Sequence, residues 1–206
     1  MQRRTLALAL AGAAALGAGT QARAQSGSWT ALFSGEDLAG FDRIGNANWR
    51  VEMGEIVADR GNGMLVTRQA FGDFTLRVEF WVDAATNSGI YIRATDPANV
   101  TAANAYEVNI WDERPDPKYG TGAIVDVAAV DPMPRAGGRW NLYEITAKGD
   151  SFTVALNGQV TVNGARNGKH ASGRIALQHG DGVKDSNGVA NDRGVVRFRK
   201  VEIRPA

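Results

Sequence analysis

Apolar and polar side chains alternate one for one along residues 74–82. The apolar ones stand at every second position: Leu76, Val78, Phe80 and Val82. Successive side chains of a β-strand point to opposite faces, so this segment predicts a strand with one face against a core. An amphipathic helix would repeat its apolar residues every three or four positions instead. No comparable helical period follows the first 24 residues.

Similar short runs recur between turns rich in glycine, asparagine and aspartate. Asn157-Gly158 separates two such runs, and this dipeptide is a strong signal for a tight hairpin. In the last run, 195–203, the apolar positions change parity near Arg199-Lys200, which predicts a β-bulge. Many short strands at close spacing predict an all-β sandwich. Long loops are expected at 96–105 and 181–193.

The N-terminus has the pattern of an export signal. Arg3 and Arg4 precede an apolar run at 6–18, and Ala22-Arg23-Ala24 has the small-x-small form of a cleavage site. We therefore expect a signal peptide over residues 1–24 and a single domain over 25–206. The alternative is an uncleaved anchor helix, although the glycines of this run and its shortness disfavour one. The expected location is periplasmic or secreted, through Sec or the twin-arginine route.

Composition excludes several classes of function. The chain has no cysteine, which excludes disulfides, thiolate catalysis and zinc sites built on sulfur. Residues 1–24 hold three arginines and no acid, so the remainder carries 20 basic and 22 acidic side chains, a net charge of −2. No basic stripe indicates a nucleic-acid partner, and no second apolar run is long enough to cross a membrane.

Polar and aromatic residues share the non-core face of two expected strands. Ile90 and Ile92 take one face of the first strand, leaving Tyr91 and Arg93 on the other side, and Asn87-Ser88-Gly89 before them is expected as a tight turn that also lines the site. Val108 and Ile110 take the core face of the second strand, and its other face is formed by Glu107, Asn109 and Trp111. Hydrogen-bonding groups beside aromatic rings suit a sugar. The alternative is an ordinary solvated sheet face.

Ten segments, in order along the chain, carry a family resemblance. They are Trp29-x-x-Leu32-Phe33-x-Gly35, Trp49-x-Val51-Glu52, Gly72-Asp73-Phe74, Asn87-Ser88-Gly89-Ile90-Tyr91-Ile92-Arg93, Tyr106-Glu107-Val108-Asn109, Thr121-Gly122-Ala123-Ile124, Gly138-x-Trp140-Asn141, Leu156-Asn157-Gly158, Gly173-x-Ile175-Ala176-Leu177-Gln178 and Phe198-Arg199. Together they resemble the 3-keto-disaccharide hydrolase family. The resemblance implies a concanavalin A-like jelly-roll sandwich of two antiparallel sheets and action on glycosides oxidised at carbon 3.

The chain departs from the family pattern at several positions. Phe41 stands where the family often has tryptophan, and Asn109 where it often has glutamine. The family's Gln-Asp-His-Gly run is Gln178-His179-Gly180 here, one acid short. The loop at 181–193 is longer than is usual for the family. These changes bear on substrate choice, and the missing acid bears on activity.

A ketone at carbon 3 acidifies the proton at carbon 2, so one base can start the cleavage. The resulting enolate expels the group at carbon 1, and water then adds. The residues expected to bear the chemistry are Glu107 or His179 as the base, with Asp112 as a further acid–base candidate. The residues expected to bind substrate are Arg93, Tyr91, Asn87, Asn109, Trp111 and Gln178. The structural alternatives are an ion pair between Glu107 and Arg93, a structural role for His179 and a turn cap for Asp112.

No cofactor or protein-held metal is predicted. Oxygen ligands for a divalent ion are available at Asp112, Glu113, Asp116, Asp181 and Asp185, but their spacing matches no calcium loop. No G-x-G-x-x-G fingerprint follows a strand, so a separate sugar 3-dehydrogenase is the expected supplier of the keto sugar. Two other functions stay open: a carbohydrate-binding module without catalysis and an interaction domain.

Overall fold

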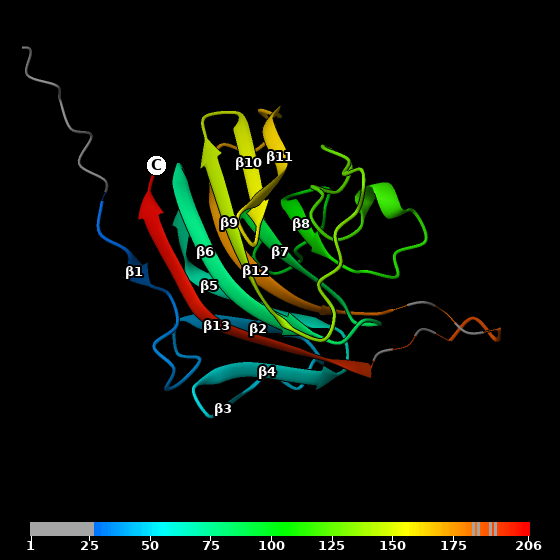
Figure 1. Ribbon diagram of the computed structural model, residues 1–206. Helices are drawn as coiled ribbons and strands as arrows, with labels where there is room; N and C mark the ends of the chain where they lie inside the picture. Colours follow the sequence, from blue (N-terminus) through cyan, green and yellow to red (C-terminus); the bar gives the residue numbers. More distant parts are fainter. Residues whose placement is uncertain (1–26, 183, 185, 190, 192) are drawn as a thin grey trace, which may run out of the picture.

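Strands of two antiparallel sheets make up most of the fold (Figure 1). The computed structural model describes residues 27–182, 184, 186–189, 191 and 193–206. The large sheet has eight strands in the order β11-β10-β9-β6-β13-β4-β3, with β1 also paired to β13. The small sheet has five strands in the order β2-β5-β12-β7-β8. The expected all-β class is therefore confirmed.

The strand bounds follow. The large sheet comprises β1 (Thr30–Ala31), β3 (Arg50–Glu52), β4 (Glu55–Arg60), β6 (Phe74–Val82), β9 (Trp140–Lys148), β10 (Ser151–Leu156), β11 (Gln159–Arg166) and β13 (Arg193–Pro205). The small sheet comprises β2 (Phe41–Gly45), β5 (Gly63–Phe71), β7 (Asn87–Ala94), β8 (Tyr106–Ile110) and β12 (Gly173–Gly180). The 3-10 helix η1 (Pro117–Tyr119) interrupts the long connection from β8 to β9.

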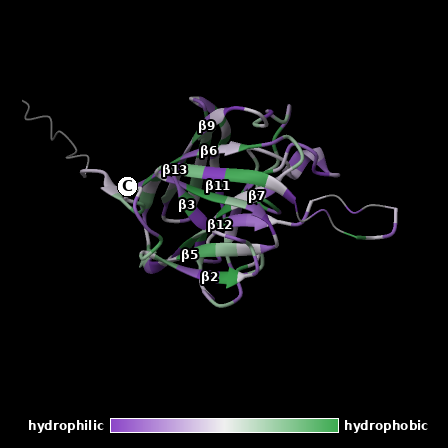
Figure 2. Cartoon of the chain, turned by 90° about the horizontal axis from the view of Figure 1, so that it is seen from below, coloured by the Kyte–Doolittle hydropathy of each residue, from purple (hydrophilic) through white to green (hydrophobic). Residues whose placement is uncertain are grey.

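The core lies between the two sheets. Alternate residues of β6 and β12, including Phe80 and Leu177, are completely buried in a cluster to which both sheets contribute. Green and purple segments follow one another along individual strands, as one buried face per sheet requires (Figure 2). Each sheet thereby keeps one face directed away from this cluster.

The structure confirms the turn, the bulge and the loop that short sequence signals predicted. Asn157 and Gly158 both have positive φ, 52° and 81°, as a two-residue hairpin turn requires. The register between β13 and β6 shifts between Arg199 and Glu202, with Lys200 at φ 50°, which confirms the predicted bulge. Residues 96–105 form a loop, as expected.

Other features were not anticipated. The short strands β1, β2 and β3 are each paired in a sheet, although no pattern was assigned to them. The connection from 111 to 139 is a third long loop. The expected signal peptide lies outside the described residues, as do parts of 181–193. Within the described part of the chain, no helix has the length and apolar character needed to cross a membrane.

Candidate functional site

The outer face of the small sheet brings together residues from β7, β8 and β12. Cross-strand pairing sets Tyr91 opposite Glu107, and Gly89 opposite both Asn109 and Gln178. Residues paired directly across a sheet project from the same face. The sequence prediction that Tyr91, Glu107 and Asn109 share a face is therefore confirmed, and Gln178 joins them.

Glu107 is a buried carboxyl group. It is only 7 % exposed, and burial raises its pKa from 4.5 to about 7 because the charged form loses its hydration. A hydrogen bond from Tyr91 and the positive charge of Arg114 act in the opposite direction, but desolvation outweighs them. A carboxyl group that titrates near neutral pH can both accept and return a proton under ordinary conditions.

Gly89 leaves room between the polar side chains of the site. A Cβ at this position would stand 3.1 Å from Oε1 of Glu107 and 3.2 Å from Oε1 of Gln178. The Gln178 amide also donates a long hydrogen bond, 3.4 Å, to the Tyr91 hydroxyl. Burial, together with the charge of Glu107, raises the pKa of Tyr91 above its usual value, so its hydroxyl remains a proton donor.

Three buried polar atoms around this face have no hydrogen-bond partner among the described residues. They are Oε1 of Gln178, Oδ1 of Asn109 and Nε1 of Trp111. Buried polar groups are normally paired, since an unpaired one costs about 1–3 kcal/mol. Two acceptors and one donor near Glu107 thus lack partners, although each has almost no exposed surface. Sugar hydroxyls can satisfy both kinds of group.

Arg114 is a cation whose charge reaches Glu107, and no sequence pattern predicted it. Its guanidinium lies 5.8 Å from the centre of the Trp111 ring, and its charge acts on both Glu107 and Tyr91. Arg114 belongs to the long loop after β8, where no periodic pattern predicts the direction of a side chain.

The expected placement of Arg93 is wrong. Its φ of 54° and the register shift between β7 and β12 mark a bulge, which turns its side chain to the opposite side from Tyr91. The guanidinium is fully buried over the Phe152 ring. It donates to the carbonyls of Gly72, Gly149 and His170 and pairs with Asp73 at 2.9 Å. Arg93 therefore joins loops and lies away from the candidate site.

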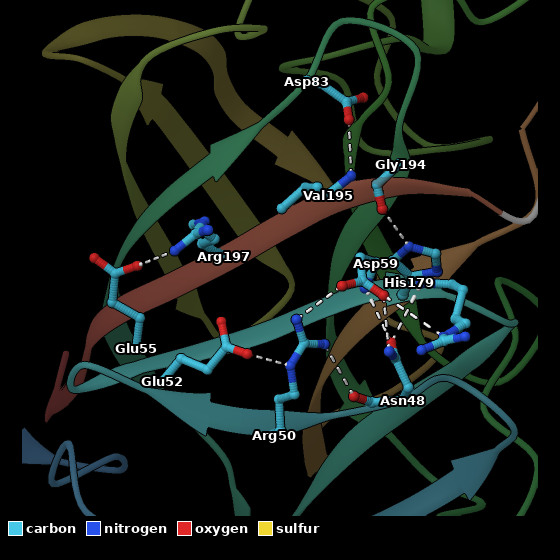
Figure 3. A network of polar contacts seen from close by, with 11 residues as sticks. Asn48, Arg50, Glu52, Glu55, Asp59, Asp83, His179, Gly194, Val195 and Arg197 are labelled. Atoms are coloured by element: carbon cyan, nitrogen blue, oxygen red, sulfur yellow. Dashed lines mark hydrogen bonds and ion pairs between the residues drawn. The ribbon is translucent and has the colours of Figure 1, made fainter.

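His179 also lies away from Glu107. It directly follows Gln178, so its ring projects from the other face of β12. The ring is fully buried, and its nitrogens lie 2.6 Å from the Gly61 carbonyl and 2.8 Å from the Gly194 carbonyl. Figure 3 shows this ring beside Gly194, whose carbonyl it contacts. Its geometry favours the structural alternative over the role of base.

Asp112 stabilises the long loop after β8. Its carboxylate accepts hydrogen bonds from the Thr121 hydroxyl, at 2.7 Å, and from the backbone amides of Ala136 and Gly137. Thr121 in turn accepts from the backbone amide of Trp111. The carboxylate is thus saturated with donors, which contradicts the expected acid–base role and agrees with the turn alternative.

Asn87 stands at the margin of the outer face. It is paired with Gly180 across the sheet, and its amide donates to the carbonyl of Asp181 at 2.6 Å. In the described residues, no group of three or more acidic or histidine side chains has the geometry of a metal site. Asp185, one of the oxygen ligands considered above, lies outside the described residues.

Comparison with known proteins identifies the family of the chain. Residues 28–204 match the model of the 3-keto-alpha-glucoside-1,2-lyase-like domain. No curated protein matches the sequence. Among solved structures, a protein of Parabacteroides distasonis classed with the glycosyl hydrolases is 22 % identical, with a TM-score of 0.66 over 87 % of this chain and 100 % of that one.

Two further structures show the same fold at lower identity. The β-glucanase of Bacillus licheniformis is 12 % identical, with a TM-score of 0.59 over 89 % of this chain and 100 % of that one. The carbohydrate-binding module CBM66 of Bacillus subtilis is 16 % identical, with a TM-score of 0.55 over 87 % and 97 %. The fold is a concanavalin A-like jelly roll. The match over residues 28–204 shows that the chain belongs to the 3-keto-alpha-glucoside-1,2-lyase-like family.

Proposed function

We propose that this protein is an exported enzyme that cleaves 3-keto-glycosides, with Glu107 as the base that removes the proton at carbon 2. The observation that carries the proposal is the buried Glu107 carboxyl, whose pKa is raised to about 7 on a face with unpaired hydrogen-bonding atoms. A base with a pKa near the working pH combines a useful ionised fraction with a useful proton affinity. Family membership supports the keto sugar as substrate class.

The reaction balances with one proton moving through the site. Glu107 takes the carbon-2 proton, and the released electron pair forms the enolate of the carbon-3 ketone. The enolate re-forms the ketone as the bond between carbon 1 and the leaving oxygen breaks, and that oxygen takes up the proton. Water then adds to carbon 1 of the unsaturated ketone, with its second proton going to carbon 2.

The neighbours of Glu107 have matching roles in this proposal. Arg114 supplies positive charge for the developing enolate. Tyr91 holds the Glu107 carboxyl by a hydrogen bond and keeps its own proton. Gln178 and Asn109 each offer an unpaired acceptor to sugar hydroxyls, and Trp111 offers a donor. No step requires a second carboxylate, unlike ordinary glycoside hydrolysis.

The proposal also includes the source of the substrate and the location of the enzyme. The substrate must be oxidised first, so a separate sugar 3-dehydrogenase acts before this enzyme. In this proposal the enzyme acts in the periplasm or outside the cell, which the export-signal pattern of residues 1–24 supports. Neither a cofactor nor a protein-held metal is part of the proposal, and a chelator should leave the rate unchanged.

The test separates proton removal from bond cleavage. Purified protein is mixed with a 3-keto-glucoside in D₂O, and exchange at carbon 2 is followed by NMR while release of the aglycone is measured. Both should occur with the keto sugar and neither with its unoxidised parent. Glu107→Gln should reduce both by about 10³-fold, the middle of the usual range for a lost general base. The matched control is Glu36→Gln, an exposed carboxylate distant in sequence.

A carbohydrate-binding module without catalysis is the second candidate. The favouring observation is the likeness to CBM66 of Bacillus subtilis, which shares the fold. A binding module should bind the keto sugar and its parent alike, with no exchange at carbon 2. That result would refute the enzymatic proposal, whereas full activity of the Glu107→Gln variant would refute only the assignment of Glu107 as the base.

A further inference from the structure

The outer face of the small sheet continues beyond the candidate site, towards β2. Strands β7, β12, β5 and β2 follow one another across this sheet (Figure 2). Pairing sets Gly89 of β7 opposite Gln178 of β12. Gln178 is in turn opposite Met64 of β5, and Met64 is opposite Ile44 of β2. Residues paired directly across a sheet project from the same face. The row of residues that begins beside Glu107 therefore ends at Met64 and Ile44, which we call the apolar strip.

The apolar strip is only half-buried. Met64 and Ile44 pack against an outer cluster in which Val66 and Ala176 are completely buried. Val66 and Ala176 are opposite one another in the neighbouring row, and Val100 from the β7–β8 loop packs in the same cluster. This packing buries one apolar row of the outer face and leaves the next one, the apolar strip, partly open to solvent.

The row changes its chemistry between its two ends. Beside Glu107 it is polar, since a Cβ on Gly89 would lie 3.1 Å from Oε1 of Glu107 and 3.2 Å from Oε1 of Gln178. At the other end, Ile44 offers no hydrogen bond and the Met64 thioether offers only a weak acceptor. A hydroxylated group placed there would lose its hydrogen bonds to water without replacement, whereas an apolar group would gain from burial.

The spacing of the strands suits a substrate that spans both ends of the row. Neighbouring strands lie about 4.8 Å apart, so Met64 is two spacings, about 10 Å, from the Gly89 position. A single ring attached to carbon 1 can extend this far when Glu107 takes the proton at carbon 2. The charge of Arg114, which acts on Glu107, comes from the connection after β8, on the opposite side from β2. The oxidised ring is therefore expected on the β8 side and the leaving group on the β5 side.

We propose that the apolar strip binds the leaving group of the substrate and that this leaving group is an apolar ring. The inference rests on the proposed function and makes it more specific, because it selects 3-keto-glycosides with an apolar ring on carbon 1 over those with a small or hydroxylated substituent. Glu107 acts on the oxidised ring while Met64 contacts the leaving ring, for which a flexible and polarizable thioether is well suited.

The first test compares three substrates with the same oxidised ring: cyclohexyl 3-keto-glucoside, methyl 3-keto-glucoside and a 3-keto-disaccharide. The cyclohexyl and methyl compounds release alkanols of similar acidity, so their difference reports binding of the leaving group. The disaccharide releases a ring of similar size that carries hydroxyl groups. The wild-type protein should prefer the cyclohexyl compound to both others by about 10-fold in kcat/KM. Preference for either of the others would overturn the apolar strip and leave the proposed function intact.

Substitution of Met64 localises this preference. Met64→Gln keeps the length of the side chain but makes it polar, so it should lose about 10-fold on the cyclohexyl compound, mostly in KM, and little on the methyl compound. Met64→Leu restores an apolar side chain and should recover most of the loss. The control is Met53→Gln, because Met53 is 90 % exposed at the turn between β3 and β4. Equal losses of Met64→Gln on both compounds would overturn the assignment.

A binding measurement gives a readout that does not depend on turnover. The chain has four methionines, and the ¹³C-methyl signal of Met64 can be assigned from the Met64→Gln variant. In Glu107→Gln protein, the cyclohexyl compound should shift the Met64 signal and leave that of Met53 in place, whereas the methyl compound should shift neither. An unmoved Met64 signal would overturn the apolar strip. Failure of the wild-type protein to cleave any of the three substrates would instead defeat the proposed function and this inference with it.

Discussion

The two faces of the sheet formed by β7, β8 and β12 use polar residues in opposite ways. On the inner side, Arg93 and His179 are fully buried and their polar groups meet backbone carbonyls or Asp73. On the outer side, Gln178 and Asn109 keep buried oxygen atoms without partners among the described residues, and Glu107 is buried at a cost to its charge. Both faces carry polar residues. Those on the inner face have hydrogen-bond partners, whereas several polar atoms on the outer face have none among the described residues.

This difference separates structural from candidate functional residues. A saturated polar group has no capacity left for a ligand and contributes to the fold, as Asp112 also illustrates. An unsatisfied one destabilises the free protein and gains a partner when a ligand binds. The comparison therefore predicts that inner-face substitutions reduce stability, whereas outer-face substitutions reduce activity and leave or improve stability.

The largest stability effect is expected for Arg93→Met. The substitution removes hydrogen bonds to three carbonyls and an ion pair, and it should lower the free energy of unfolding by about 4 kcal/mol. Urea unfolding monitored by tryptophan fluorescence measures the change. Arg68→Met removes an ion pair between exposed partners and should cost under about 1 kcal/mol. Equal losses in the two variants would refute the assignment of Arg93 to the fold.

The next effect is a pH dependence of stability caused by Glu107. Its pKa is about 7 in the folded protein, whereas the ordinary value, which applies to the unfolded chain, is 4.5. Between pH 4.5 and pH 7 the folded protein therefore keeps a proton on Glu107 that the unfolded chain has lost. Stability therefore declines as pH rises through this window, by about 3 kcal/mol in total. Glu107→Gln should lack this part of the decline and be more stable than the wild type at pH 8.

Denaturant unfolding at pH 5 and pH 8 checks this prediction. The difference between the wild type and Glu107→Gln isolates one carboxyl group, because all other titrating groups are common to both proteins. Parallel pH profiles would show that Glu107 is not desolvated in the folded state.

A smaller stability effect is expected for His179→Phe. The phenyl ring fits a buried position of similar size but leaves the carbonyls of Gly61 and Gly194 without their partner, at a cost of about 2 kcal/mol. The rate of carbon-2 exchange per folded molecule should stay within about 3-fold of wild type, far from the loss expected of a general base. A 10³-fold loss with normal stability would restore His179 as a candidate base.

The smallest effect is expected for Gly89→Ala. The added methyl group would stand 3.1 Å from Glu107 and 3.2 Å from Gln178, so the two side chains must shift by a few tenths of an ångström. We expect KM to rise about 10-fold with little change in stability, as small displacements at a binding site do. The control is Gly72→Ala, whose Cβ meets nothing within 4 Å. Equal KM values for the Gly89→Ala and Gly72→Ala variants would show that the substrate does not use the space beside Gly89.

Much of the fold followed from local signals. The strand at Phe74–Val82, the turn at Asn157-Gly158 and the bulge at Arg199-Lys200 each depend on side-chain periodicity or backbone preference over a few residues. The short strands β2 and β3 were missed because a strand of three to five residues has too little pattern to register, and its pairing partner decides its state.

The candidate site was predicted less well. Tyr91, Glu107, Asn109 and Gln178 share a face as periodicity predicts. Strand alternation already indicated that His179 lies on the other face, because it directly follows Gln178 and adjacent strand residues face opposite ways. Arg93 carried no such signal, because strict alternation places it beside Tyr91.

The sequence by itself determined the β-sandwich, the family and the strand face that carries Glu107. Side-chain periodicity and short motifs depend only on residues close together in the sequence. Only the tertiary structure decided that Arg93 turns inward at a bulge, that Arg114 approaches Glu107 from a loop, and that burial raises the carboxyl pKa to about 7. The bulge and the raised pKa depend on segments distant in the sequence, since bulges form against a partner strand and desolvation comes from everything packed around a group. The loop that carries Arg114 has no periodic pattern from which its path could be predicted.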